Sequence, residues 1–334
     1  MKVLFLKDDK PGHYNQTEGL LFYLREIFPN LEVEYIEVEI KSKFSRKILR
    51  FLLNNFSSFF ERKSRLKYLS FFYKNYKLPK NNPDLIISTG GNVSNINAWF
   101  SKAYNCKNIL NGALRGLKEE LFTYVTTVID LGYKNQIILD VAPNTITKEK
   151  LLEKSIEFSS LHNLDINQKY YSLLIGGDGA GYKYEDKFYT DLIDFVGKIS
   201  KEKNIRWLIT TSRRTPLSVE NRLEMELKDY CSYFVSYNKK EEKVLLAFLG
   251  LSEAIFVTEE SSSMISEAIS SAKDVFTIGN EYSNSDENYK NILNKFELNN
   301  FIKKIDIFNF TLGLDFIKPT NINLNFKNKI KELF

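Results

Sequence analysis

The sequence repeats one pattern: a short apolar run, a turn of small and polar residues, and then a segment with helical spacing. In the first half, the runs Lys2–Leu6 and Asp84–Ser88 are followed by the turns Lys7–His13 and Thr89–Ser94. Strands that alternate with helices in this way form a parallel sheet with helices on both faces. The pattern therefore predicts an α/β fold.

A second series of alternating strands and helices begins at Tyr170. The chain has 334 residues, more than one hydrophobic core usually supports, and the polar segment Asp140–Gln168 is the expected boundary. We therefore expect two Rossmann-like domains with a cleft between them. The predicted parts are an N-terminal domain over residues 1–150 with an insert at 41–80, a C-terminal domain over 165–320, and a helix at 321–334 that packs back on the N-terminal domain.

Composition excludes several classes of protein. The two cysteines, Cys106 and Cys231, give neither a disulfide framework nor the spacing of a zinc site. No apolar stretch approaches the roughly 20 residues of a membrane-spanning helix, and the N-terminal apolar run is too short for a signal peptide. These features predict a cytoplasmic protein that is not integral to a membrane.

The segment Lys41–Lys80, here called the basic insert, is rich in basic and aromatic residues. It holds twelve Lys or Arg residues against one acid, Glu61, although the net charge of the chain is only +5. Its apolar residues lie at helical spacing, and this composition is typical of helices that lie on anionic membranes. A core-packing helix pair with a solvated face is the alternative. Nucleic acid is disfavoured as a partner because no nucleic-acid-binding motif accompanies the charge.

The turn after the first strand is the expected position of an active-site loop. His13 is the candidate general base because histidine titrates near neutral pH. Asp9 is predicted to share the catalytic role, and Asp8 is an equivalent carboxylate beside it; both could instead cap the helix. A capped helix start with an incidental histidine is the alternative interpretation. Residues expected to bind an acceptor at this edge are Gly12, Asn15, Gln16, Gly90, Gly91 and Asn92.

The stretch Leu174-Ile-Gly-Gly-Asp-Gly179 ends the first strand of the second series. Glycine lets a backbone approach a phosphate closely, so Gly176, Gly177 and Asp178 are predicted to bind a nucleotide. The stretch lacks both the Gly-x-Gly-x-x-Gly spacing of dinucleotide sites and the Gly-Lys-Ser/Thr of a P-loop. A nicotinamide dehydrogenase and an NTPase are therefore disfavoured.

Two further strand ends carry polar clusters suited to phosphate. Arg213 and Arg214 are costly to bury without an anion, although a salt-bridged pair is the alternative. Ser261–Ser263 precede a helix, where hydroxyls and N–H groups either bind phosphate or simply cap the helix, and Glu267 could accept both hydroxyls of a ribose. The predicted nucleotide-sugar-binding residues here are Thr211, Ser212, Arg213, Arg214, Glu260, Ser261, Ser262, Ser263, Met264 and Glu267.

Taken together, these motifs resemble those of the bacterial "mitochondrial fission" ELM-type family. The resemblance covers about residues 1–280, and the Ser-Arg-Arg-Thr-Pro stretch is its most specific part. Two features depart from the family pattern: the basic insert, and the Gly-Gly-Asn stretch at 90–92, where a glycine followed by a basic residue is expected at Gly90. The segments that carry the resemblance are Lys10-Pro-Gly-His-Tyr-Asn-Gln16, Leu174-Ile-Gly-Gly177, Thr210-Thr-Ser-Arg-Arg-Thr-Pro216 and Val257-Thr-Glu-Glu-Ser-Ser-Ser-Met-Ile-Ser-Glu-Ala268.

That family is in turn similar to GT-B glycosyltransferases, such as the lipid II-forming N-acetylglucosaminyltransferase and lipid A disaccharide synthase. The resemblance implies that Gly176 and Gly177 open the donor domain, that Ser262, Ser263 and Glu267 bind the nucleotide, and that His13 acts on the acceptor. It also implies docking on the inner face of the cytoplasmic membrane through the basic insert.

The expected function is metal-independent transfer of a sugar from a nucleotide sugar to a cell-envelope glycan or lipid-linked acceptor, as in lipopolysaccharide or capsule synthesis. No Asp-x-Asp motif lies in a suitable loop, so neither a metal nor another cofactor is expected. The alternatives are a sugar-nucleotide epimerase or hydrolase, and a non-catalytic adaptor at a membrane. The sequence does not distinguish donor sugar, base or acceptor.

Overall fold

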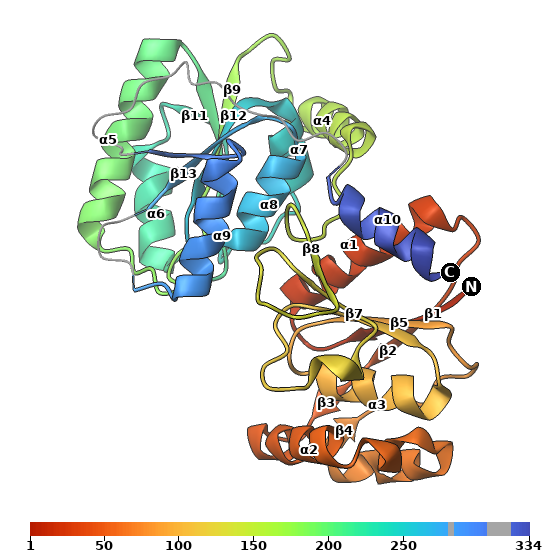
Figure 1. Cartoon of the computed structure of the whole chain (residues 1–334). Coiled ribbons are helices and arrows are strands. Elements are labelled where there is room, and N and C mark those ends of the chain that lie inside the picture. The colour runs from red at the N-terminus through yellow and green to blue at the C-terminus, as the bar shows by residue number, and fades with distance from the viewer. Residues whose placement is uncertain (280–283, 306–321) are drawn as a thin grey trace. The chain divides into compact units, whose positions relative to one another are not determined.

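The computed structural model describes residues 1–279, 284–305 and 322–334. Backbone contacts divide the chain into two units: Met1–Thr145 with Asn323–Phe334, and Ile146–Ile322. The division falls inside the expected boundary segment Asp140–Gln168, while the expected end of the second domain at residue 320 lies outside the described residues. Each unit is a parallel sheet covered by helices (Figure 1), so the predicted α/β class with two Rossmann-like domains is confirmed.

The first unit is built on a parallel six-stranded sheet of order β2-β1-β5-β6-β7-β8. Its strands are β1 (Lys2–Lys7), β2 (Glu32–Glu37), β5 (Leu85–Thr89), β6 (Lys107–Asn111), β7 (Tyr124–Thr127) and β8 (Gln136–Ile138). Its helices are α1 (Pro11–Ile27), α3 (Ser94–Tyr104), the short η3 (Glu119–Leu121) and α10 (Leu324–Leu333).

Side chains of this sheet alternate between two cores, as the period of a strand requires. Val3 and Phe5 of β1 pack with α1 and α10 on one face, and these two helices lie against each other (Figure 1). Leu4 and Leu6 pack with α3 and the basic insert on the other face. The buried Asn323 anchors the returning helix, because its side chain accepts from the N–H of Asp140 at 2.7 Å.

The basic insert forms one regular helix and a series of turns. Its elements are α2 (Lys43–Asn55), η1 (Ser57–Glu61), η2 (Lys63–Phe71) and β4 (Tyr73–Asn75), and β4 pairs with β3 (Glu39–Ile40), which directly precedes the insert. Both interpretations of its sequence describe part of it. Leu49, Leu53 and Phe60 are buried in the core, whereas Phe44 and Phe51 are 71% and 60% exposed.

The second unit has a parallel six-stranded sheet of order β11-β10-β9-β12-β13-β14. Its strands are β9 (Tyr170–Leu174), β10 (Arg206–Thr210), β11 (Cys231–Val235), β12 (Ser252–Thr258), β13 (Asp274–Ile278) and β14 (Lys303–Ile305). Its helices are α4 (Lys148–His162), α5 (Asp186–Lys203), α6 (Leu217–Glu226), α7 (Leu245–Leu251), α8 (Ser262–Ser270) and α9 (Glu287–Leu298). Among the helices described in either unit, none combines the length and apolar character needed to cross a bilayer.

Candidate functional site

The first unit gathers polar side chains where β1, β5 and β6 end. These strands are neighbours in the sheet, so the residues that follow them meet at one edge, as ligand-binding residues do in open α/β sheets. Asp8 follows β1, Gly90 follows β5, and Asn111 ends β6. The buried Asn111 donates to Gln16 at 2.8 Å and to Thr89 at 3.3 Å, so α1 is fixed to this edge.

His13, in the first turn of α1, forms a hydrogen-bonded pair with Asp8. Its Nδ1 lies 2.9 Å from Oδ2 and 3.1 Å from Oδ1 of Asp8. The Asp8 side chain is 3% exposed and that of His13 is 27% exposed. A carboxylate on Nδ1–H fixes the imidazole tautomer and leaves Nε2 free to accept a proton. The pair thus has the geometry of an oriented general base.

Asp8 is held in its charged form by its hydrogen bonds. Burial raises the pKa of this carboxyl, but the hydrogen bond and charge of His13, the N–H of Lys10 and the amide of Asn92 together hold it below its usual value. Asn92 Nδ2 donates to Asp8 at 3.0 Å. The Asn92 oxygen accepts from Arg46 at 3.0 Å, so a continuous chain of contacts runs from His13 to the basic insert.

Gly90 provides the surface on which the His13 ring lies. Its φ is +91°, and a Cβ built on it would lie 2.2 Å from Cε1 of His13. A side chain at this position would be strained by the backbone angle and would displace the ring. Gly90 therefore has a positioning role.

The other residues predicted for this edge differ in placement. Asp9, predicted as a catalytic residue, is exposed on the loop, and it is Asp8 that contacts His13. Gly12 and Asn15 are also exposed, on the first turns of α1. The choice between Asp8 and Asp9 is not visible in the sequence, because burial of one of two adjacent acids depends on how the loop turns.

In the second unit, three predicted loops converge. β10, β9 and β12 are adjacent, so the residues after their carboxyl ends lie together. Gly177 forms an isolated bridge with Arg214, and Ser212 donates from its hydroxyl to the carbonyl of Gly176. The amide of Gly176 in turn donates to Thr258 at 2.8 Å. The glycine loop, the arginine loop and the end of β12 thus form one cluster.

The centre of this cluster is an ion pair rather than a free arginine. Arg214 donates to the fully buried carboxylate of Glu260 at 3.1 Å, and Tyr184 donates to the same carboxylate at 2.9 Å. Burial raises the pKa of Glu260 to about 7, against the opposing effects of Arg214 and Tyr184. Arg214 is therefore salt-bridged to an acid of the same unit, whereas Arg213 is exposed and carries no ion pair among the described residues.

Glycines make room for this ion pair. A Cβ built on Gly176 would lie 1.4 Å from Oε1 of Glu260, and one on Gly179 would lie 1.8 Å from a terminal nitrogen of Arg214. Asp178 is exposed and closes the loop by accepting from the N–H of Tyr184 at 3.0 Å. Only glycine at these positions lets the guanidinium lie against the backbone.

The start of α8 combines a capping serine with two further hydroxyl residues. Ser261 is the N-cap, and its hydroxyl accepts from the N–H of Met264 at 3.5 Å. Ser262 and Ser263 occupy the first turn and are half-buried. Glu267, one turn further, is also half-buried, and burial raises its pKa to about 7.

Thr211 has a structural role in the second unit. Its hydroxyl donates at 2.5 Å to Glu220, which is fully buried and also accepts from Ser236. The network holds the arginine loop on α6. Sequence reasoning did not assign a role to Glu220 or Tyr184, because a single acid and a single tyrosine carry no motif.

The titration of Glu267 leads to a test of its burial. The folded protein keeps the proton up to about pH 7, whereas an ordinary glutamate loses it near 4.5, so this group stabilises the fold below pH 4.5 and the contribution is lost as pH rises to 7. Glu267→Gln is expected to be more stable than the wild type at pH 8 by about 2 kcal/mol, with little difference at pH 4.5.

Chemical denaturation at both pH values measures this difference. Glu202→Gln, which changes an exposed glutamate on α5, is the control and is expected to follow the wild type. Parallel stability profiles for wild type and Glu267→Gln would show that this carboxyl is solvated.

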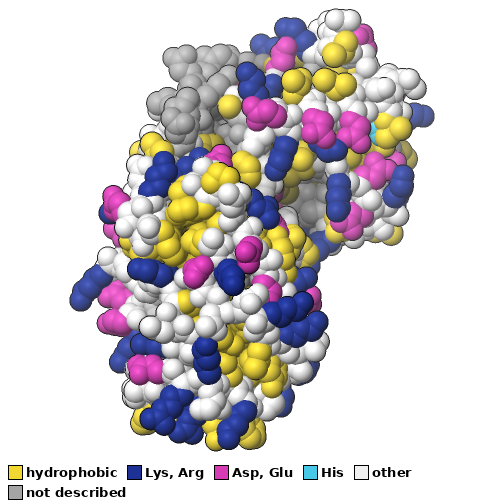
Figure 2. Space-filling model, turned by 90° about the vertical axis from the view of Figure 1, so that its right-hand side faces the viewer, with side chains coloured by type: hydrophobic (Ala, Val, Ile, Leu, Met, Phe, Trp, Pro, Cys, Tyr) yellow, Lys and Arg dark blue, Asp and Glu magenta, His cyan; other side chains and the backbone are white. Residues whose placement is uncertain are grey.

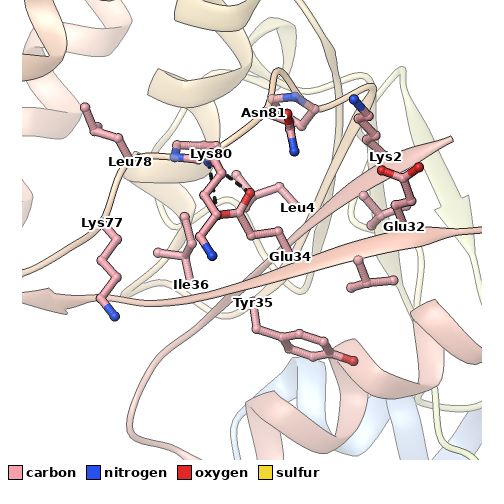
Figure 3. A pocket seen from close by; sticks show the side chains of 14 residues that line it. Lys2, Leu4, Glu32, Glu34, Tyr35, Ile36, Lys77, Leu78, Lys80 and Asn81 are labelled. Atoms are coloured by element: carbon pink, nitrogen blue, oxygen red, sulfur yellow. Dashed lines mark hydrogen bonds between the residues drawn. The ribbon is translucent and has the colours of Figure 1, made fainter.

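Other cavities lie away from these residues. A cavity of about 480 Å³ runs between edge strand β2 and residues 77–83 (Figure 3). There the N–H of Lys80 donates to both oxygens of Glu34, at 3.1 and 3.0 Å. It borders the beginning of β1, at Lys2, and contains none of the predicted site residues. Within the described ranges, no three His, Cys, Asp or Glu side chains cluster as metal ligands do.

Solved structures share the fold over nearly the whole chain. UDP-GlcNAc 2-epimerase from Methanocaldococcus jannaschii superimposes with a TM-score of 0.57 at 11% identity, covering 100% of this chain and 99% of that one. A putative UDP-N-acetylglucosamine 2-epimerase from Listeria monocytogenes superimposes with a TM-score of 0.51 at 10% identity, covering 99% of this chain and 87% of that one. E. coli ADP-heptose LPS heptosyltransferase II superimposes with a TM-score of 0.49 at 11% identity, covering 100% of this chain and 98% of that one. At these identities the likeness to the first two structures shows the fold alone.

Sequence comparison identifies the family. A search among curated proteins gives no match. The model of the family described as mitochondrial fission ELM1 matches residues 11–306, a span that includes the His13 turn, the Gly176 loop, the Arg213–Arg214 pair and the start of α8. The predicted resemblance is therefore confirmed, and the chain belongs to the mitochondrial fission ELM1 family.

Proposed function

We propose that this protein is a glycosyltransferase that moves a sugar from a nucleotide sugar to a hydroxyl of a cell-envelope acceptor. The observation that carries the proposal is the His13–Asp8 pair, at 2.9 Å, at the carboxyl edge of the first sheet. Transfer to a hydroxyl needs a base that takes the hydroxyl proton as the new bond forms. His13 Nε2 would accept that proton, and Asp8 would stabilise the imidazolium.

The second unit would bind the donor. Its Gly176 loop, the first turn of α8 and the exposed Arg213 present N–H groups, hydroxyls and a cation at one sheet edge, a combination suited to a diphosphate. Arg213 would stabilise the charge that develops on the departing nucleotide, and such stabilisation is usually the largest catalytic term. Glu267 would accept the ribose hydroxyls. No metal is assigned to the reaction.

A sugar-nucleotide epimerase or hydrolase is the second candidate. It is favoured by one observation, the TM-score of 0.57 with UDP-GlcNAc 2-epimerase over the whole chain. Incubation with a panel of nucleotide sugars, with and without lipid-linked and soluble glycan acceptors, separates the two. Product that forms only with acceptor supports transfer, whereas an altered or hydrolysed nucleotide sugar in its absence supports the second candidate.

The acceptor is proposed to lie at a membrane surface. α2 carries Phe44, Ile48 and Phe51 on one exposed side, with Lys43 and Lys47 beside them. The end of the unit that carries α2 shows basic and hydrophobic side chains next to one another (Figure 2). The same composition lines a cavity of about 640 Å³, formed by Leu52, Phe56, Ser58, Phe59, Phe60, Glu61, Arg62 and Arg65. Basic charge and exposed aromatics together fit an anionic bilayer.

The donor site is tested by Arg213→Ala. Because this arginine is exposed and unpaired in the described structure, its loss leaves no buried charge behind, and nucleotide affinity is expected to fall by about 2 kcal/mol, the worth of a charge-assisted hydrogen bond. Isothermal titration with UDP, GDP, CDP and ADP measures it. Arg222→Ala, on the neighbouring helix α6, is the control. Equal affinity of wild type and Arg213→Ala for the bound nucleotide would remove Arg213 from the site.

A further inference from the structure

Three arginines of the first unit converge on the loops that follow β5 and β6. Arg46 and Arg50 belong to α2, and Arg115 lies between β6 and η3. A Cβ built on Gly91 would lie 2.8 Å from Cδ of Arg115 and 4.0 Å from a terminal nitrogen of Arg46. A Cβ on Gly116 would lie 3.1 Å from a terminal nitrogen of Arg50.

These cations are not neutralised within the structure. In the described part of the chain, none of the three forms an ion pair with an acid. Arg46 donates to the amide oxygen of Asn92 at 3.0 Å, and Arg50 donates to the carbonyl of Arg115 at 2.5 Å. Each guanidinium has five N–H donors, so most of them are left for another acceptor.

The loop that carries Arg115 is held in a strained conformation. Its φ is +50°, in the left-handed region that non-glycine residues rarely adopt. α2 holds it there: Asn54 donates to the carbonyl of Gly116 at 2.9 Å and accepts from the N–H of Lys118 at 3.0 Å. Strain of this kind persists where the surrounding structure enforces it, and it is common at ligand-binding sites.

The same contacts connect the arginines to the candidate base. Arg46 binds Asn92, which binds Asp8, which binds His13. Gly90 carries the His13 ring and the next residue, Gly91, carries the Arg115 side chain. Because successive Cα atoms are about 3.8 Å apart, an anion bound at Gly91 lies next to the imidazole.

We propose that Arg46, Arg50 and Arg115 form a binding site for a phosphate or diphosphate group beside His13. Several guanidinium forks at one point match the charge and the oxygens of phosphate. The role of this site rests on the proposed function: the anion would belong to the acceptor, whose hydroxyl it would hold near Nε2 of His13.

Titration of the full-length protein with inorganic pyrophosphate tests the anion site directly. Arg46→Gln with Arg115→Gln is expected to raise the Kd about tenfold or more, whereas the control Lys47→Gln, an exposed neighbour on α2, leaves it unchanged. Circular dichroism and thermal unfolding verify that the variants are folded. A higher Kd for pyrophosphate in Arg213→Gln would indicate that pyrophosphate binds the second unit instead.

The outcomes decide the proposal independently of catalysis. Affinity that is lost only with Arg213→Gln, or that no variant changes, overturns it. Failure to bind any nucleotide would contradict the proposed function but leave the pyrophosphate result standing. Titration with farnesyl diphosphate shows whether the bound phosphate belongs to a lipid or to a soluble molecule. If farnesyl diphosphate binds more tightly than pyrophosphate and the double variant loses this affinity too, the ligand is a lipid-linked phosphate. If the two compounds bind equally well, the ligand is a soluble phosphate. Both results support the site.

Discussion

Replacing His13 with alanine is expected to lower turnover by roughly 10²–10⁴-fold, the usual contribution of a general base. The side chain is 27% exposed and contacts Asp8 and Gly90, so its loss leaves no cavity in a hydrophobic core. Nucleotide affinity should be unchanged, because the nucleotide is proposed to bind the second unit. Initial rates of wild type and His13→Ala, measured with the donor and acceptor found by the nucleotide-sugar panel, give the ratio of their turnover numbers.

Two companion variants sharpen this result. Asp8→Asn should also reduce turnover, because an amide no longer selects the tautomer with a free Nε2. His162→Ala removes the other histidine, on α4, and is expected to retain the wild-type rate. Near-normal turnover of His13→Ala would exclude it as the base and direct attention to another acid at the same edge.

The fold was largely predictable because the buried strands of a parallel α/β sheet are continuous apolar runs in the sequence. The apolar runs before Gly90, Gly176 and Ser212 are buried central strands, and turns of glycine and hydroxyl residues end them. Residues after such strands share one sheet edge whatever the strand order is, so Gly176, Arg214 and Glu260 could be grouped from sequence alone. Their pairing, with Arg214 bound to the buried Glu260, depends on side-chain packing that no motif encodes.

The role of the basic insert was only partly predictable. Its charge and aromatic content pointed to a surface helix, but α2 has two sides of different character. Arg46, Leu49, Arg50 and Leu53 lie at the i, i+3, i+4 and i+7 positions of one face, and Arg46 and Arg50 contact the loops of the first unit. Spacing alone could have separated this face from the exposed one, yet it could not show which loops the arginines reach.

This division of α2 determines how membrane binding must be tested. Arg46 and Arg50 also belong to the proposed anion site, so a loss of vesicle binding on substituting them would be ambiguous. Phe44 and Phe51 are suitable instead, because they are 71% and 60% exposed. Lys43 and Lys47 are both exposed beside them, so substituting these lysines measures the electrostatic contribution to vesicle binding.

Phe44→Ser with Phe51→Ser is expected to weaken binding to anionic vesicles by at least about 100-fold, since each buried phenylalanine contributes about 1.5–3 kcal/mol. Lys43→Gln with Lys47→Gln should weaken it by about 1 kcal/mol per residue, and only this part should vanish at high salt. Flotation with phosphatidylglycerol vesicles at low and high salt measures both. Leu161→Ser with Met225→Ser, exposed apolar residues of the second unit, is the control. If wild type and the phenylalanine variant float equally, or neither floats, α2 does not enter a bilayer and the acceptor is soluble.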